Sequence, residues 1–206
     1  MIALSFFDYS GVMMLPWAKA GYECHCFDIQ GNHNPAHPNI SHHQEDIADN
    51  GLYWASSFSR NRDEIVFASF FPPCDHLAVS GARWFKGKGL RALARAIELF
   101  AYSAEIAEKL GAPYLIENPV STISTYWRKP DYTFDPCDYG DPYTKKTCLW
   151  TGNGFVMPPK NPVEPTDGSK MHKLPPGPER KQIRSQTPEG FARAVFEANA
   201  PTKAAA

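Results

Sequence analysis

One cysteine follows the most apolar stretch of the sequence. Residues Ile65–Phe70 predict a buried strand, which runs directly into Phe71-Pro72-Pro73-Cys74. The two prolines stiffen the turn and hold Cys74 at the carboxyl end of the strand. A thiol in that place can act as a nucleophile if its surroundings lower its pKa. Taken alone, a cysteine after a strand is more often a small core residue.

A carboxyl group follows a second predicted strand. Tyr114–Ile116 is succeeded by Glu117-Asn118-Pro119, and the proline keeps this segment extended. The carboxyl ends of parallel strands meet at one edge of a sheet, where ligands bind. A carboxyl group there can protonate or hydrogen-bond a ring nitrogen of an aromatic base. The alternative is an ordinary acidic loop residue.

The elements that must position these groups alternate between strand and helix. Ile2–Phe7 and Tyr22–Phe27 complete a set of four predicted strands. The clearest helix is Leu90 to Leu110, ended by Gly111, with an apolar stripe of Leu90, Leu93, Ala94, Ile97, Phe100, Ala101, Ala104 and Ala107. Such alternation predicts an α/β fold with a doubly wound, mostly parallel sheet.

Three segments together carry a family resemblance. The stretch from Phe71 to Arg83 resembles the catalytic Pro-Cys loop of the cytosine-C5 DNA methyltransferases, and Glu117-Asn118-Pro119 is similar to their Glu-Asn-Val motif. Tyr139 to Thr147 is similar to their Gly-x-Pro-Gln-x-Arg-x-Arg segment. Order and spacing agree for all three, over roughly residues 2 to 154. The resemblance implies the Rossmann-like class I fold of S-adenosylmethionine-dependent methyltransferases.

The resemblance also implies a mechanism. The Cys74 thiolate would add to C6 of a cytosine, and Glu117 would hold N3 and stabilise the charge that develops there. Lys145 stands near the position of a family arginine that binds the carbonyl oxygen of the base. Pro73, Ser80 and Asn118 are expected to contact the substrate. The partner would be DNA, with its cytosine flipped out of the duplex.

S-adenosylmethionine is the cofactor that the resemblance implies. Asp8-Tyr9-Ser10-Gly11 falls where the family has a Phe-x-Gly-x-Gly turn, which cradles the methionine part of the cofactor. Asp28, followed by Ile29, ends the second strand, where an acid would hold the ribose hydroxyls. Asp46-Ile47 resembles the acidic residue and neighbour that contact the adenine.

The sequence departs from the family in three places. Val12-Met13-Met14 follows Gly11 instead of further glycines, and Lys145 loses the bidentate fork of an arginine. The large target-recognition domain has no counterpart. In its place stands a segment from Phe155 to Arg184 with many prolines and basic residues. We therefore expect reduced or absent sequence specificity.

Charge and composition define three regions. Residues 145–184 carry eight basic and three acidic residues, +5 in all, so the rest of the chain carries −6 to give the net charge of −1. We expect a catalytic domain over 1–154, a proline-rich basic loop over 155–186, and a C-terminal helix and tail over 187–206 that pack on the same domain. The helix should open at Thr187-Pro188-Glu189. The basic loop could hold a polyanion, although a solvated loop is an equally good interpretation.

Three other features of the sequence limit which functions are possible. Two cysteines and five histidines lie between residues 24 and 43, but their spacing fits no common zinc site, so we expect no metal. The opening residues lack a basic region and reach Asp8 at once, which is not typical of a signal peptide and favours the cytoplasm. The chain has five cysteines, an odd number, which argues against a disulfide framework.

The sequence leaves three functions open. The first is a minimal DNA cytosine-C5 methyltransferase. The second is the same chemistry on a free cytosine nucleotide, which the absent recognition domain suggests. The third is an inactive relative that binds nucleic acid or a partner without turnover, which the altered cofactor turn suggests. Cys74 and Glu117 weigh against the third, because an inactive copy has no chemical reason to keep both.

Overall fold

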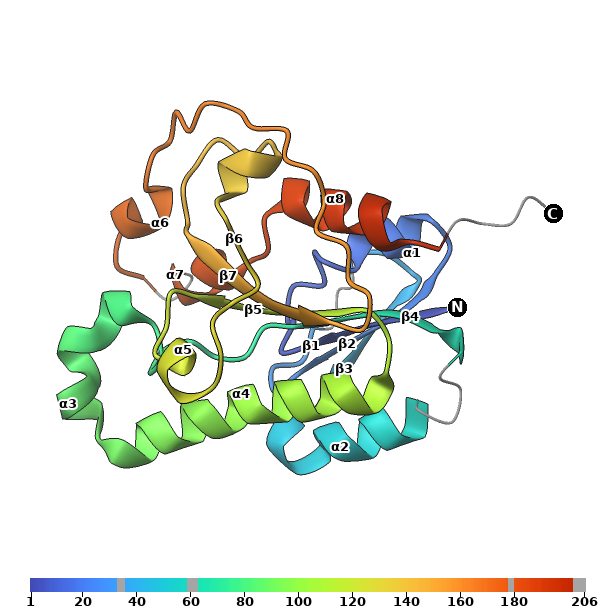
Figure 1. Ribbon diagram of the computed structural model, residues 1–206, viewed down its shortest axis with the longest axis horizontal. Coiled ribbons are helices and arrows are strands. Elements are labelled where there is room, and N and C mark those ends of the chain that lie inside the picture. Colours follow the sequence, from blue (N-terminus) through green and yellow to red (C-terminus); the bar gives the residue numbers. More distant parts are fainter. Residues whose placement is uncertain (33–35, 59–62, 178–179, 202–206) are drawn as a thin grey trace.

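The centre of the molecule is one mixed β-sheet covered on both faces by helices. The computed structural model describes residues 1–32, 36–58, 63–177 and 180–201 (Figure 1). Within these ranges the strand order is β3-β2-β1-β4-β5-β7-β6. The strands are β1 (Ile2–Phe6), β2 (Glu23–Asp28), β3 (Ile40–Gln44), β4 (Ile65–Phe70), β5 (Tyr114–Pro119), β6 (Tyr132–Phe134) and β7 (Thr147–Gly152).

The direction of the strands changes at one side of the sheet. Strands β1 to β5 pair in parallel, whereas β7 runs antiparallel to β5 and β6 runs antiparallel to β7. Every residue of β1 and β4 is buried, because helices cover both faces of a parallel sheet. The predicted doubly wound, mostly parallel α/β sheet is therefore confirmed. Only β7 is reversed, between β5 and β6, and this arrangement is consistent with the Rossmann-like class I methyltransferase fold.

Two apolar cores lie on opposite faces of the sheet. One contains Leu4, Phe6, Phe70 and Ile116 beneath α2 (Ile47–Phe58) and α4 (Leu90–Leu110). The other contains Trp17, Phe67 and Leu115 beneath α1 (Leu15–Lys19) and α8 (Glu189–Asn199). Figure 1 shows α2 and α4 below the sheet and α1 and α8 above it. The remaining elements are η2 (Val79–Trp84), α3 (Phe85–Lys88), α5 (Ile123–Tyr126), η3 (Pro136–Tyr139), α6 (Lys170–Lys173) and α7 (Arg180–Ser185).

Helix α4 has the predicted bounds, but its buried stripe is rotated. Phe100 and Ala107 are buried as predicted, and Leu93, Ile97 and Ala104 pack against the core. Leu90, Ala94 and Ala101 are instead exposed, and the stripe runs through Ala96, Ser103, Ile106 and Leu110. The reason is that Leu90 begins the helix beyond the edge of the sheet, where there is no core to cover it. Gly111 ends the helix in the left-handed conformation, as expected.

The predicted proline-rich loop forms an irregular strap across the molecule. We call residues 155–186 the basic strap. No regular helix or strand is present from residue 155 to 169, and only the short α6 and α7 follow among the described residues. The strap is tied to the loop before β7: Thr144 N donates to Gly168 O and Asp167 N donates to Pro142 O, both at 2.9 Å.

The C-terminal helix begins close to the predicted position and is held by the same loop. Pro188 is the N-cap of α8, and Gly190 N donates to Oδ2 of Asp141 at 3.0 Å. Phe191 stacks on Phe134, with ring centroids 3.9 Å apart. Both ends of the chain from residue 167 to 190 are thus fixed on residues 141–144. Among the described residues, no helix combines the length and apolarity that a membrane-spanning segment needs.

Candidate active site

The Cys74 loop leaves the carboxyl end of β4 and turns sharply. Phe71 N donates to Phe6 O at 3.0 Å, which continues the sheet by one residue. The carbonyl oxygen of Cys74 then accepts from the N–H groups of Leu77 and Ala78, at 3.0 and 2.9 Å. The turn leaves the cysteine partly exposed, and no disulfide involves it. A thiol at this position is therefore both fixed in place and open to a substrate.

The end of β5 and the residues that follow it clamp this loop. Asn118 Nδ2 donates to Pro72 O at 2.9 Å, and the side chain of Asn118 is fully buried. Further along, Val79 N donates to Val120 O and Thr122 N donates to Leu77 O. The side chain of Asn118 holds the Pro-Cys loop through Nδ2, and the substrate contact expected of it stays a prediction, since Oδ1 has no hydrogen-bond partner among the described residues. Asn118 is a positioning residue.

Lys145 reaches the site because β7 is antiparallel to β5. Pro119 pairs with Thr147, so the chain just before β7 lies beside the chain just after Glu117. The backbone N–H of Lys145 donates to Oδ1 of Asp135 at 2.8 Å. Its Nζ lies 3.7 Å from Oε1 of Glu117, and the two side chains are 17% and 16% exposed. The ion pair is accordingly only slightly hydrated.

The charged groups of the site all affect the pKa of the Cys74 thiol. The pKa of Cys74 is raised to about 11: burial raises it most, Glu117 and Asp75 also raise it, and Lys145 and Arg184 lower it. Burial likewise raises the pKa of Glu117, and Lys145 partly offsets the effect. The thiol, the carboxyl group and the two cations thus share one electrostatic environment.

Arg184 is a member of this environment that the sequence did not single out. It lies in α7, within the basic strap, and its side chain is exposed. The only signal in the sequence was the excess of positive charge over residues 145–184. Charge excess does not say which cation reaches the thiol, because that depends on how the strap folds back.

The other two expected substrate contacts lie on the outside of the Cys74 loop. Pro73 is exposed beside Cys74, and Ser80 is exposed in η2. Both belong to the segment between β4 and α4, at the same edge of the sheet as Cys74. They are presented to solvent where a substrate would approach.

The expected cofactor turn is organised by a buried carboxylate. Asp8 is 4% exposed and accepts from Ser5 Oγ at 2.7 Å, Ser10 Oγ at 2.9 Å and Gly11 N at 2.8 Å. Gly11 has φ = +67°, and a Cβ there would lie 3.2 Å from Nε2 of His42. Asp8 therefore shapes the turn from below, while Tyr9 and Ser10 remain partly exposed on it.

The residues that replace the family glycines do not fill this turn. Met13 and Met14 have no exposed surface and lie in the core beneath α1 and α8. Their side chains point away from the Tyr9–Gly11 backbone into that core. The departure from the family pattern therefore changes the packing behind the turn, while Asn32 Nδ2 donates to Tyr9 O at 3.0 Å and His42 lies beside Gly11.

Asp28 and Asp46, the two other acidic residues expected to bind the cofactor, differ in the exposure of the residues that follow them. Oδ1 of Asp28, at the end of β2, accepts from Gln30 N at 2.8 Å, and the neighbouring Ile29 is 64% exposed. Oδ1 of Asp46 accepts from Ala48 N at 2.9 Å and so caps α2. Ile47 is only 2% exposed, in the core below the sheet. The ligand contact expected of Ile47 is therefore wrong for its side chain, because α2 turns it inward.

The histidines and cysteines of residues 24–43 do not assemble a metal site in the described part of the chain. Cys24 and Cys26 are buried on one face of β2, as small apolar residues. His25 Nδ1 lies 2.9 Å from His43 Nε2, and His25 Nε2 lies 3.1 Å from Oε1 of Glu23. His33 lies outside the described residues.

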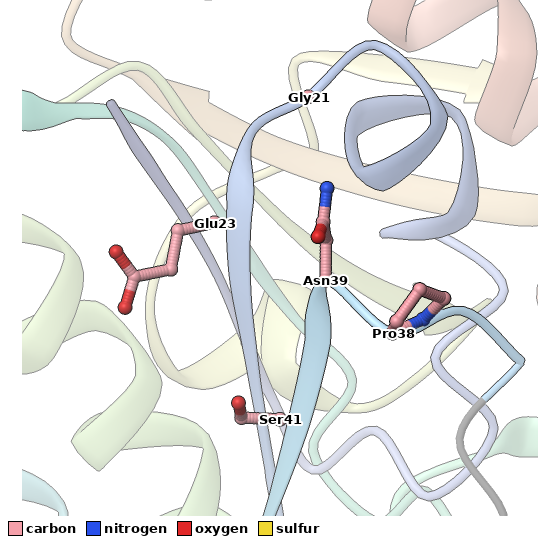
Figure 2. A pocket seen from close by; sticks show the side chains of 5 residues that line it. All are labelled: Gly21, Glu23, Pro38, Asn39 and Ser41. Atoms are coloured by element: carbon pink, nitrogen blue, oxygen red, sulfur yellow. The ribbon is translucent and has the colours of Figure 1, made fainter.

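A surface depression marks the opposite end of the sheet. It is lined by Gly21, Glu23, Pro38, Asn39 and Ser41, around the starts of β2 and β3 (Figure 2). The side chains of Glu23 and Asn39 point in different directions and do not converge on a common point (Figure 2). Ligands of such sheets bind at the carboxyl ends of the strands, so this depression is separate from the Cys74 site.

Comparison with known proteins supports the fold. No family model and no curated protein match the sequence. A solved structure of a protein described as a DNA modification methyltransferase encoded within a prophage (E. coli) matches with a TM-score of 0.55 and 18% sequence identity. The match covers 80% of this chain and 53% of that one, so this chain spans about half the length of the protein it resembles.

Proposed function

We propose that the protein is an S-adenosylmethionine-dependent DNA cytosine-C5 methyltransferase that works through a covalent Cys74 adduct. The observation that carries this proposal is the convergence of Cys74, Glu117 and Lys145 on one edge of the sheet. A cytosine ring is activated by a thiol that attacks C6 and by a carboxyl group that binds N3, on the opposite edge of the ring. The structural neighbour, described as a DNA modification methyltransferase, supports DNA as the substrate.

Cys74 supplies the nucleophile. Its sulfur forms a bond to C6 of the cytosine, and the electron pair of the C5–C6 double bond moves to C5 and toward N3. At the end of the cycle the C5 proton is lost, the double bond re-forms and the thiolate leaves. The pKa of the free thiol is about 11 with Lys145 and Arg184 already lowering it, so the thiolate must form as the substrate binds.

Glu117 stabilises the charge that forms on the ring. Because burial raises its pKa, the carboxyl group has an increased tendency to stay protonated and donate a hydrogen bond to N3. Lys145, 3.7 Å away, is placed to hold the carbonyl oxygen of the same base. These contacts strengthen as negative charge develops on the ring, which is the condition for catalysis.

The residues at the carboxyl ends of β1 and β2 fit the cofactor. The Tyr9–Gly11 turn follows β1, and Asp8 holds its backbone by accepting from Ser10 Oγ and Gly11 N. Asp28 places a carboxyl group at the end of β2, where a ribose can be held. S-adenosylmethionine would supply an electrophilic methyl group to C5 from this side of the sheet.

A methyl-transfer assay with a matched cysteine control tests the proposal. Labelled S-adenosylmethionine is incubated with DNA or with dCMP, using the wild type, Cys74→Ala and Cys137→Ala. Cys137 is also partly exposed but lies in η3, so it serves as the control. We expect label in DNA for the wild type and Cys137→Ala, and at least a 10³-fold loss for Cys74→Ala.

Other outcomes would contradict the proposal in defined ways. Label in dCMP alone would point to a nucleotide methyltransferase. Full transfer by Cys74→Ala would exclude the covalent mechanism. DNA containing 5-fluorocytosine gives a direct readout, because its C5 fluorine cannot leave as a proton and the Cys74 adduct should persist in mass spectrometry.

A further inference from the structure

An arm of cationic and aromatic residues projects beside the Cys74 site. It comprises η2, α3 and the first turn of α4, residues 79–91, and Figure 1 shows α3 standing out from the body of the protein. Between Asp75 and Glu98 the sequence has no acidic residue but has Arg83, Lys86, Lys88, Arg91 and Arg95. Residues 82–84 and 86–91 are all exposed. The arm thus concentrates positive charge on a surface open to solvent.

The arm also exposes a large aromatic ring. Trp84 is 61% exposed, and the guanidinium carbon of Arg83 lies 5.0 Å from the centre of its ring. Val79 is 48% exposed and Leu90 is 83% exposed on the same segment. An exposed indole with a guanidinium beside it offers a flat face and a positive charge, the two features that hold stacked nucleobases.

The arm is fastened to the catalytic loop. Lys88 Nζ donates to the carbonyl oxygen of Asp75 at 2.6 Å, and Asp75 is the neighbour of Cys74. Ala78 forms a bridge with Ser121, just after β5. The position of Trp84 is therefore coupled to the position of the reacting thiol and not to the rest of the surface.

We propose that this arm binds single-stranded DNA, with Trp84 stacking on an unpaired base next to the target cytosine. The inference rests on the proposed function and adds the form of DNA that the site takes. A positive groove with stacking aromatics is the usual means of holding a single strand. A single strand also spares the cost of extruding the cytosine from a duplex.

Binding to labelled DNA, measured by fluorescence anisotropy without cofactor, tests the proposal independently of methyl transfer. The probes are a cytosine-containing strand of about 16 nucleotides and the same sequence as a duplex. The variants are Trp84→Ala, Trp84→Phe and the control Trp127→Ala. Trp127 is 47% exposed and has Arg128 over its ring, but it packs edge-on against Phe100 beside α4.

We expect the wild type to bind the single strand about tenfold more tightly than the duplex, and Trp84→Ala to lose about tenfold of that affinity. Trp84→Phe should keep most of the affinity, since it keeps a stacking ring, and Trp127→Ala should bind like the wild type. Equal or tighter binding of the duplex by the wild type would overturn the proposal. So would unchanged single-strand binding by Trp84→Ala, with folding of each variant verified by its thermal transition.

Discussion

The reactivity of Cys74 depends on a balance between burial and two cations. Burial, Glu117 and Asp75 all raise the pKa of the thiol, and only Lys145 and Arg184 lower it. In the free protein, with a pKa of about 11, nearly all of the thiol is protonated at neutral pH. Bringing a substrate to the site must therefore be accompanied by loss of this proton.

This balance predicts how alkylation of Cys74 depends on pH and on Arg184. Between pH 7 and 10, below the pKa, each unit of pH should raise the iodoacetamide rate about tenfold, since the thiolate is the reacting form. Arg184→Ala removes a cation that lowers the pKa, so its rate at a given pH should fall, by about threefold. Peptide mass spectrometry follows Cys74 separately from the other cysteines.

The control for this prediction is another exposed arginine. Arg193, in α8, acts on Asp141 and does not act on Cys74. Arg193→Ala should leave the alkylation rate of Cys74 unchanged. If both variants slow alkylation equally, the effect belongs to the overall charge of the protein and not to Arg184.

The sequence predicted the residues that carry the reactive groups better than it predicted which residues hold the site in place. Cys74 lies just after β4 and Glu117 lies near the end of β5, so the topology of the sheet places both at one edge. Lys145 was indicated by the family pattern. Asn118 and Ile47 were expected to face ligands, but Asn118 also clamps the Pro-Cys loop and Ile47 lies in the core. Which way a side chain points after a strand depends on neighbours far away in the sequence, such as Pro72 and Ile106.

At the scale of elements, the contact between β5 and the Pro-Cys loop is a buried hydrogen bond. Asn118→Ala removes the donor and leaves the carbonyl oxygen of Pro72 buried without it. We expect a loss of about 1–3 kcal/mol in the free energy of unfolding, measured in urea. The loss of methyl transfer should exceed what the fraction of unfolded protein explains, because the loop that carries Cys74 is released.

A second asparagine provides the comparison. Asn50 Nδ2 donates to Oε2 of Glu45 at 2.7 Å, but at an exposed position on α2. Asn50→Ala should change the free energy of unfolding by less than about 0.5 kcal/mol and leave transfer intact. A similar loss of stability for both variants would show that the Pro72 contact has no special weight.

Four of the five strands that pair in parallel could be read from the sequence, but β3, β6 and β7 could not. Three of the four predicted strands have continuous apolar runs, which is the signal that burial on both faces leaves. β3 (Ile40–Gln44) is Ile-Ser-His-His-Gln, and β6 has only three residues, so neither carries such a run. Their positions come from pairing with β2 and β7, which is tertiary information.

At the scale of the whole molecule, we expect three partly buried histidines to set the acid limit of stability. Burial lowers the pKa of His25, of His42 and of His43, with Glu23 and Asp8 partly opposing the effect at the first two. His25 and His43 also repel each other when charged. Since their pKa is lower in the folded protein, the unfolded chain binds more protons as the pH falls below about 6.5.

We therefore expect the melting temperature to be level above pH 7 and to fall between pH 6.5 and 5, by about 2–4 °C for each kcal/mol lost. His43→Gln removes one titrating ring and its repulsion of His25, so the fall should be smaller. Differential scanning calorimetry across this range measures both curves. A parallel fall in the variant would show that carboxylates, and not this pair, control the acid limit.

The second half of the basic strap is flanked by two residues, Gly168 and Gly190, that are held by one short loop, and this has a consequence for protein engineering. Because Gly168 and Gly190 are both hydrogen-bonded to residues 141–144, whatever lies between them can change length without shifting Lys145. Pro175-Pro176-Gly177 is exposed at the middle of that span. A domain that recognises a base sequence could be inserted at this exposed site. Its two connections would be held by residues 141–144, so it would lie near the Cys74 thiol and could add sequence selectivity to a small protein.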